Sequence, residues 1–139
     1  MPRKKKILDG IKSRQRVKDF GEVFTPEHIV KDMCALIPDE MYGLEHTFLE
    51  PSCGNGNFLV HILNRKLEKA HNPMDALKAL NCLYGGDILP DNVRECRDRL
   101  LKICMSMEGW NTVHTLRACN ILECNIICNN FLTMGDVWE

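Results

Sequence analysis

The stretch "FLEPSCGNGNFL", residues 48–59, decides how this chain is expected to fold. A short apolar run opens it, two glycines flank an asparagine, and a second apolar run with helical spacing follows. Glycine lacks a Cβ, so Gly54 and Gly56 allow the backbone to turn sharply and to lie close to a ligand. A helix that begins at Asn57 presents free N–H groups and the positive end of its dipole. The stretch predicts a strand, a loop suited to a carboxylate or phosphate, and a helix; a plain tight turn is the alternative.

Hydrophobic patterning around this stretch predicts strands that alternate with helices. The expected strands are 47–49, 82–84 and 126–128, and the expected helices are 26–37, with Thr25 as its N-cap, 57–69, 73–81, 90–107 and 116–122. Residues 85–87 are expected to form a second glycine-rich bend at a strand end, 109–115 to form a loop, and Lys66 to point outward. Alternation of this kind predicts an α/β fold with a parallel sheet. Such sheets bind ligands at the carboxyl ends of their strands, near the switch in strand order.

Length and composition indicate one ordinary globular domain. The chain has 139 residues, of which 45% are apolar and 27% charged, close to the average for such domains. No apolar run approaches the roughly 20 residues of a membrane span, and no apolar core follows the basic N-terminus as it would in a signal peptide. We therefore expect a cytoplasmic protein with no membrane partner.

The eight cysteines indicate neither a disulfide framework nor a metal site. No Cys-x-x-Cys pair occurs, and a disulfide framework requires a secreted context. Cys119, Cys124 and Cys128 are the nearest approach to a metal signal, but their spacings fit zinc knuckles poorly. We expect buried, reduced thiols that act as small hydrophobic side chains.

Charge divides the chain into a basic arm, residues 1–20, and an acidic body, residues 21–139. The arm has eight Lys or Arg against two Asp, a net charge of +6, whereas the body has ten bases against seventeen acids, a net charge of −7. A basic arm is a candidate DNA contact because cations displace counterions from phosphates. A solvated, flexible tail is the alternative. The candidate DNA-contact residues are Arg3, Lys4, Lys5, Lys6, Lys12, Arg14, Arg16 and Lys18.

Asp87, at the end of the second expected strand, is a candidate ligand for a ribose. Its two oxygens can accept hydrogen bonds from both ribose hydroxyls, and Ile88 can pack flat on a purine; a turn residue before Pro90 is the alternative. A dinucleotide cofactor is disfavoured on two grounds. Leu59 stands where that fingerprint requires glycine or alanine, and Asp87 lies further along the chain than the usual roughly 20 residues.

Four stretches occur in an order that resembles a known family: "GEVFTPEHIVKDM", "FLEPSCGNGNFL", "YGGDILPDNV" and "NIICNNFL". They are similar to the amino-terminal part of the catalytic domain in S-adenosylmethionine-dependent DNA adenine methyltransferases. Within that family, the four stretches resemble the modification subunits of type I restriction systems and related single-chain enzymes. The resemblance extends from about residue 21 to the end. It implies a Rossmann-like class I methyltransferase sheet, truncated to three or four parallel strands with flanking helices.

The resemblance also implies which residues hold the methionine part of the cofactor. Phe24, Thr25 and Pro26 correspond to a loop that closes over it. The loop that holds its amino acid portion corresponds to Glu50, Pro51, Gly54 and Gly56. The family usually has Asp at the position of Glu50, but a carboxylate that faces the cofactor's ammonium is retained.

The adenosine part of the cofactor has its own set of implied contacts. Asp87 corresponds to the acid on the ribose and Ile88 to the neighbour of the adenine. The segment that touches the adenine corresponds to Asn130, Phe131 and Leu132. The family usually has Asp at the position of Asn130, and an amide there can still donate and accept hydrogen bonds.

The catalytic element of the family, Asn-Pro-Pro-Tyr or Asp-Pro-Pro-Tyr, is absent, because no Pro-Pro pair occurs in the sequence. The terminal "MGDVWE" resembles the start of the fourth strand, which precedes that element in the family. No catalytic residue is therefore assigned. We expect this chain to bind cofactor at most, and either to need a partner chain that carries the catalytic half or to be a fragment. Specificity or restriction subunits are further candidate partners. The alternatives are a non-enzymatic remnant or regulatory module that binds cofactor, DNA or a restriction–modification subunit, and a DNA-binding accessory protein.

Overall fold

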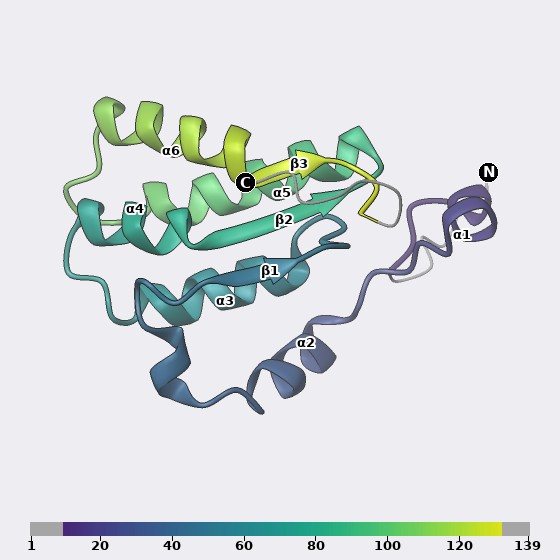
Figure 1. The fold of residues 1–139 in the computed structure, drawn as a ribbon, viewed down its shortest axis with the longest axis horizontal. Helices are drawn as coiled ribbons and strands as arrows, with labels where there is room; N and C mark the ends of the chain where they lie inside the picture. Colours follow the sequence, from purple (N-terminus) through teal and green to yellow (C-terminus); the bar gives the residue numbers. More distant parts are fainter. Residues whose placement is uncertain (1–9, 132–139) are drawn as a thin grey trace, which may run out of the picture.

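The computed structural model describes residues 10–131, which form a three-stranded parallel sheet with helices around it (Figure 1). The strands are β1 (Phe48–Glu50), β2 (Leu83–Asp87) and β3 (Ile126–Cys128), in the order β1-β2-β3. Phe48 lies opposite Leu83, and Gly85 lies opposite Ile126. The α/β class and the parallel sheet that the sequence predicted are both confirmed.

The helices are α1 (Arg14–Phe20), α2 (Glu27–Cys34), α3 (Asn57–Leu67), α4 (Pro73–Asn81), α5 (Pro90–Met105) and α6 (Thr112–Asn125), with a short 3-10 helix, η1 (Asp39–Tyr42). The predicted loop at 109–115 is wrong in its second half, because α6 begins at Thr112. The side chain of Asn111 caps α6 by accepting hydrogen bonds from the amides of Val113 and His114. No helix within residues 10–131 is long and apolar enough to cross a membrane.

The helices α3, α4, α5 and α6 all contact β2. Burial along the strands shows which face of the sheet they cover. Leu83 and Ile126 are fully buried, whereas Leu49, which points to the opposite face, is 55% exposed. One face of the sheet therefore carries the core, and the other is open at β1 in the part of the chain that the structure describes.

Lys66 is a correction to the sequence analysis, which placed it on the outer face of α3. Its side chain is fully buried, and its ammonium donates hydrogen bonds to the backbone carbonyls of Gly43, Leu44 and His46, at 2.7, 3.2 and 2.5 Å. Burial lowers the pKa of this ammonium. The helical pattern could not predict that Lys66 is buried, because its partners are backbone carbonyls of a loop 20–23 residues earlier in the chain.

Gly85 and Gly86 are a second correction, because they lie inside β2 rather than in a bend after it. A Cβ at Gly85 would lie 2.8 Å from the Cδ1 atom of Leu59, and a Cβ at Gly86 would collide with the ring of Phe131. The two glycines therefore let α3 approach one face of the strand and Phe131 approach the other.

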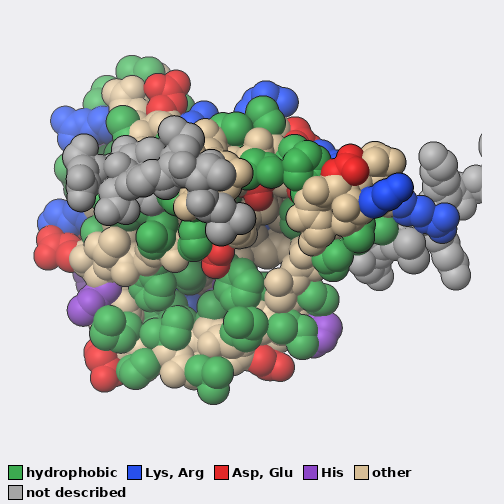
Figure 2. Space-filling view, turned by 45° about the vertical axis from the view of Figure 1, so that its right-hand side comes forward, with side chains coloured by type: hydrophobic (Ala, Val, Ile, Leu, Met, Phe, Trp, Pro, Cys, Tyr) green, Lys and Arg blue, Asp and Glu red, His purple; other side chains and the backbone are tan. Residues whose placement is uncertain are grey.

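The helix α2 differs from its prediction at both ends. Its N-cap is Pro26, without a side-chain hydrogen bond, rather than Thr25, and it ends at Cys34. Val30 and Cys34 are buried as expected, but Ile29 and Met33 of the predicted apolar face are exposed. Figure 2 shows apolar side chains gathered over the lower part of the molecule, where α2 lies in Figure 1.

All eight cysteines are free. Cys34, Cys53, Cys96 and Cys104 are buried, as the sequence predicted, but Cys124 and Cys128 are exposed. Cys124 lies on the exposed side of α6 and Cys128 is the last residue of β3, so neighbouring apolar residues did not indicate their exposure. No group of three metal-ligating side chains occurs within residues 10–131.

Candidate functional site

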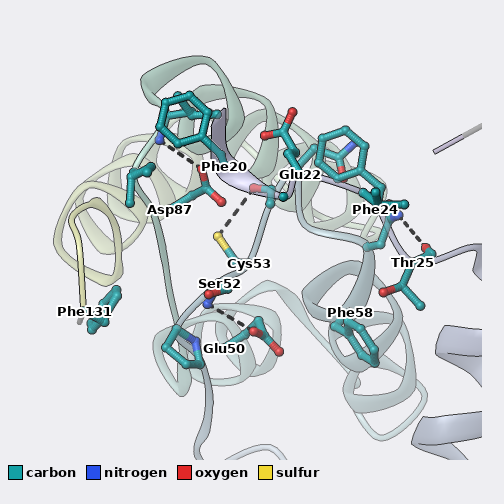
Figure 3. Close-up of a pocket in the computed structure, with 18 of the residues that line it drawn as sticks. Phe20, Glu22, Phe24, Thr25, Glu50, Ser52, Cys53, Phe58, Asp87 and Phe131 are labelled. Atoms are coloured by element: carbon teal, nitrogen blue, oxygen red, sulfur yellow. Dashed lines mark hydrogen bonds between the residues drawn. The ribbon is translucent and has the colours of Figure 1, made fainter. Parts of the chain in front are cut away.

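A cavity of about 770 Å³ lies where the carboxyl ends of the three strands meet (Figure 3). Its walls come from the loops after the strands and from the segment before α2. Residues predicted to bind a cofactor line it, namely Phe24, Thr25, Glu50, Pro51, Gly54, Asp87, Ile88, Asn130 and Phe131. Pro26 and Gly56 do not line it; Pro26 caps α2 and Gly56 precedes α3. Leu132 lies outside the described residues. The structure thus brings together side chains from four separate stretches of sequence.

Two positions in the glycine loop, residues 51–56, require glycine. Both have a positive φ, of +53° at Gly54 and +99° at Gly56, a region that side chains rarely adopt. A Cβ at Gly54 would lie 3.1 Å from the ring of Phe24, and a Cβ at Gly56 would lie 2.8 Å from the Sγ atom of Cys96. The loop is therefore pressed between the segment before α2 and the helix α5.

The helix α3 begins beside the cavity without a side-chain cap. The side chain of Asn57 is engaged elsewhere: its amide donates to the carbonyl of Thr25 at 2.9 Å, and its oxygen accepts from Arg99 at 2.8 Å. The first amides of a helix have no partners within the helix, and they carry the positive end of its dipole. This end of the cavity can therefore accept a carboxylate or another small anion.

Glu50 supplies a carboxylate at the end of β1. Its Oε1 accepts a hydrogen bond from the amide of Ser52 at 3.1 Å, as Figure 3 shows. Burial raises the pKa of Glu50 because the charged form is poorly solvated. A cation bound next to this carboxylate would offset that penalty.

Asp87 plays a structural role and also faces the cavity. Its Oδ1 accepts hydrogen bonds from the amide of Leu89 at 3.0 Å and from the side-chain amide of Asn92 at 3.2 Å. The turn before Pro90 is thus held by Asp87, as one of the two sequence interpretations expected. Its other oxygen, Oδ2, receives no hydrogen bond from any described residue, and Asp87 lines the cavity. The two roles use different oxygens, so they are compatible.

Asn129 is a cavity residue that the sequence analysis missed. It is 8% exposed, and its backbone N–H donates to the backbone carbonyl of Asp87 at 3.0 Å. The Oδ1 atom of its side chain has no hydrogen-bond partner among residues 10–131. A buried amide oxygen without a partner destabilises the fold unless a ligand or water donates to it. Its neighbour Asn130 also lines the cavity.

The charged side chains that line the cavity are all acidic. Glu22, Glu50 and Asp87 line it, and no Lys or Arg occurs among the described residues that do. Four phenylalanines also contribute to its walls, namely Phe20, Phe24, Phe58 and Phe131. Carboxylates and aromatic rings attract cations, and they disfavour a diphosphate. The cavity is therefore suited to a ligand with a positive centre and an aromatic part.

The N-terminal segment, residues 10–25, is held against the start of α5. Lys12 forms ion pairs with Asp91 and Glu95, each at 2.9 Å. Arg16 forms ion pairs with Glu22 at 2.7 Å and with Asp91 at 2.6 Å. The hydrogen bond from Arg16 is the main reason why the pKa of Asp91 lies well below its usual range.

Lys12 and Arg16 were predicted DNA contacts, and in the structure both side chains form ion pairs with carboxylates of this chain. Arg14 and Lys18 are exposed on α1. Arg3, Lys4, Lys5 and Lys6 lie outside the described residues.

Some of the residues that sequence reasoning missed have roles that depend on partners distant in sequence, such as Glu22, Asn92 and Arg99. Glu22 stands in the recognised stretch "GEVFTP", and Phe58 lies two residues after the glycine loop, so both had a usable signal. Asn92 and Arg99 had none beyond helical spacing on α5.

A parallel α/β sheet with a glycine loop after β1 and an acid at the end of β2 defines a Rossmann-like methyltransferase fold. The sequence agrees with this class: residues 10–114 match the N-6 DNA methylase family. The chain belongs to the N-6 DNA methylase family and is a DNA methyltransferase-like protein. No curated protein and no solved structure matches it.

The glycine loop generates a stability prediction. Gly56→Ala should lower the free energy of unfolding by about 2–5 kcal/mol, the sum of a positive φ and a forced contact with Cys96. Gly21→Ala is the matched control, since Gly21 has φ +64° but nothing within 4 Å of its Cβ position. Gly21→Ala should lower the free energy of unfolding by no more than about 1–2 kcal/mol. Urea unfolding measures both, and equal losses would show that the contact with Cys96 is not tight.

Proposed function

We propose that this chain binds S-adenosylmethionine in the cavity at the strand ends, as the methyl donor for adenine in DNA. One observation carries the proposal: the cavity combines two carboxylates that form no ion pair among the described residues, Glu50 and Asp87, with four phenylalanines and an uncapped helix N-terminus, and no Lys or Arg lies among its described lining residues. S-adenosylmethionine carries a sulfonium, an ammonium, a carboxylate and an adenosine. Its net positive charge suits this lining, and its single carboxylate suits the start of α3.

The lining residues suggest how the cofactor lies. Its ribose hydroxyls donate to Oδ2 of Asp87, and its ammonium lies next to Glu50. Its carboxylate accepts from the first amides of α3. Its adenine lies between Ile88 and Phe131, where the buried Oδ1 atom of Asn129 can accept from the exocyclic amine. This pose satisfies the unpaired buried oxygen and assigns one chemical group to each wall.

A dinucleotide cofactor fits this cavity less well. Its diphosphate would bring two further negative charges close to Glu22, Glu50 and Asp87, and no described cation of the lining would meet them. The distribution of charge therefore supports the same conclusion as the misfit of Leu59 to the dinucleotide fingerprint.

Methyl transfer requires more than cofactor binding. The exocyclic nitrogen of adenine attacks the methyl carbon, the carbon–sulfur bond breaks, the thioether product leaves, and the nitrogen releases a proton. The target base must be flipped out of the duplex and its amine held in line with the methyl group. The family performs this with the Asn-Pro-Pro-Tyr element, which these 139 residues lack. We propose that a polypeptide segment outside these 139 residues, such as a second chain, supplies it.

The outer edge of β1 is the place where such a chain would join. The ladder bond from the amide of Phe48 to the carbonyl of Cys82 points Phe48 toward β2, so the backbone groups of Leu49 point away from it. Among the described residues no strand pairs with that edge. Exposed apolar side chains of α2 lie on the same side of the sheet (Figures 1 and 2). A parallel strand that ends in the catalytic element fits there, and would bring it next to the cavity. Specificity or restriction subunits would be further partners.

Cofactor binding is tested by calorimetry with S-adenosylmethionine. Saturable binding is expected, and Asp87→Ala should weaken it roughly 10- to 100-fold, since a hydrogen bond to a charged group is worth about 1.5–3 kcal/mol. Asp98→Ala, which removes an exposed acid of α5, should leave the affinity unchanged. No heat at millimolar ligand with folded protein would contradict the proposal and favour the DNA-binding accessory protein.

Transfer is tested with labelled cofactor and mixed-sequence DNA. The chain alone should transfer no detectable label, because positioning of the amine is worth roughly 7–11 kcal/mol of the barrier. Label should appear when a chain that carries Asn-Pro-Pro-Tyr and a complementary strand is added. Clear transfer by the chain alone would show that the missing element is not needed. Cofactor binding without transfer, whatever chain is added, would favour the non-enzymatic module.

We further propose that the basic arm contacts DNA through Arg3, Lys4, Lys5, Lys6, Arg14 and Lys18. Each phosphate contact adds about 0.9 to the slope of log affinity against log salt. Arg14→Ala combined with Lys18→Ala should therefore reduce that slope by about 1–2 in duplex titrations at increasing salt. Lys102→Ala combined with Arg117→Ala, which removes two exposed cations of α5 and α6, is the control. Equal slopes for both double variants would leave the solvated tail as the better description.

A further inference from the structure

Asn92 has an unusual position for a polar side chain. It is fully buried in the first turn of α5, and both ends of its amide are used. Its oxygen accepts from the ammonium of Lys12 at 2.7 Å, and its nitrogen donates to Glu22 at 2.5 Å and to Asp87 at 3.2 Å. One side chain thus joins the N-terminal segment, the cavity wall and the predicted ribose ligand.

The contacts around Asn92 form one continuous network. Arg16 bridges Glu22 and Asp91, and the side chain of Glu22 is only 9% exposed. A carboxylate buried to this extent is stable only when charged or donor groups surround it. Arg16 and Asn92 are the groups that do so here. The network therefore runs from α1 through Glu22 and Asn92 to Asp87.

We infer that Asn92 is a positioning residue for the cofactor, which couples the N-terminal segment to Asp87. The inference rests on the proposed function. Asn92 and the amide of Leu89 both donate to the same oxygen of Asp87, which fixes the carboxylate and leaves Oδ2 toward the cavity. The same amide group of Asn92 holds Glu22, whose neighbours Val23 and Phe24 form part of the cavity wall.

Removal of the side-chain amide of Asn92 would affect both Glu22 and Asp87. Glu22 and Asp87 accept from one nitrogen, so they are two carboxylates kept together by a single donor group. Without it they repel each other, and Asp87 loses one of the two bonds that set its orientation. The N-terminal segment then loosens, and the ribose contact weakens with it.

The test compares S-adenosylhomocysteine with its 2′,3′-dideoxy analogue, which cannot donate to Asp87. Asn92→Ala should weaken the affinity for S-adenosylhomocysteine about tenfold and the affinity for the dideoxy analogue less than about threefold. Only S-adenosylhomocysteine can use the positioned carboxylate of Asp87. In an Asp87→Ala background, Asn92→Ala should likewise weaken binding of S-adenosylhomocysteine by less than about threefold. Arg97→Ala is the control on the same helix, because Arg97 donates to the carbonyl of Ile126 instead. Equal losses for both ligands, or unchanged affinity, would overturn the inference.

A second measurement does not depend on the ligand. The amide of Phe24 donates to the carbonyl of Gly10 at 2.6 Å, so its hydrogen exchange reports on the N-terminal segment. Asn92→Ala should accelerate this exchange several-fold, whereas Arg97→Ala should not. Unchanged exchange would overturn the coupling. If the wild-type chain binds neither ligand, the proposed function fails. Hydrogen exchange at Phe24 then decides whether Asn92 holds the N-terminal segment. Asn92→Asp keeps the acceptor for Lys12 and loses both donations, so it gives the same tests if Asn92→Ala does not fold.

Discussion

The contact between the glycine loop and the helix α5 is the constraint on which the site depends. Gly56 lies so close to Cys96 that a Cβ there would be 2.8 Å from the sulfur. This approach sets where α3 begins and how the loop faces the cavity. Asn92 and Arg99 extend the same side of α5, one turn before and one turn after Cys96. Asn92 holds Asp87, and Arg99 donates to the carbonyl of Asn55. One stripe of a single helix therefore positions the loop after β1 and the acid after β2.

Charge is separated in a way that serves the proposed ligand. Lys12 turns toward Asp91 and Glu95 on α5. Arg16 pairs with Asp91 and with Glu22 of the cavity wall. Glu50 and Asp87 of the cavity form no ion pair among the described residues. The segment thus forms one wall while Lys12 and Arg16 are paired with carboxylates and neither lines the cavity. A cofactor with a sulfonium benefits from that arrangement, because its charge meets carboxylates and aromatic rings in a poorly solvated space. The demethylated product has lost this charge, so the cavity should hold it less tightly.

Local signals made much of the fold predictable from the sequence. The helix at Pro73–Asn81 and the strand at Ile126–Cys128 have the predicted bounds, because a proline at the start of a helix and a short apolar run act through neighbouring residues. Nine of the twenty residues that line the cavity were predicted cofactor contacts, and seven of these nine lie at or just after the end of a strand. Lys66 and Asn92 were not predictable in this way. Lys66 finds its carbonyls in a loop, and Asn92 finds Glu22 at a separation of 70 residues. The hydrophobic pattern carries no information about such polar partners.

A crystal structure of the chain with S-adenosylhomocysteine tests the central claim most directly. The account predicts density for the ligand at the ends of the three strands. The ribose hydroxyls should lie within hydrogen-bond distance of Asp87, the ammonium beside Glu50, and the adenine near Asn129. Ligand bound anywhere else, or a ribose that does not reach Asp87, would contradict it.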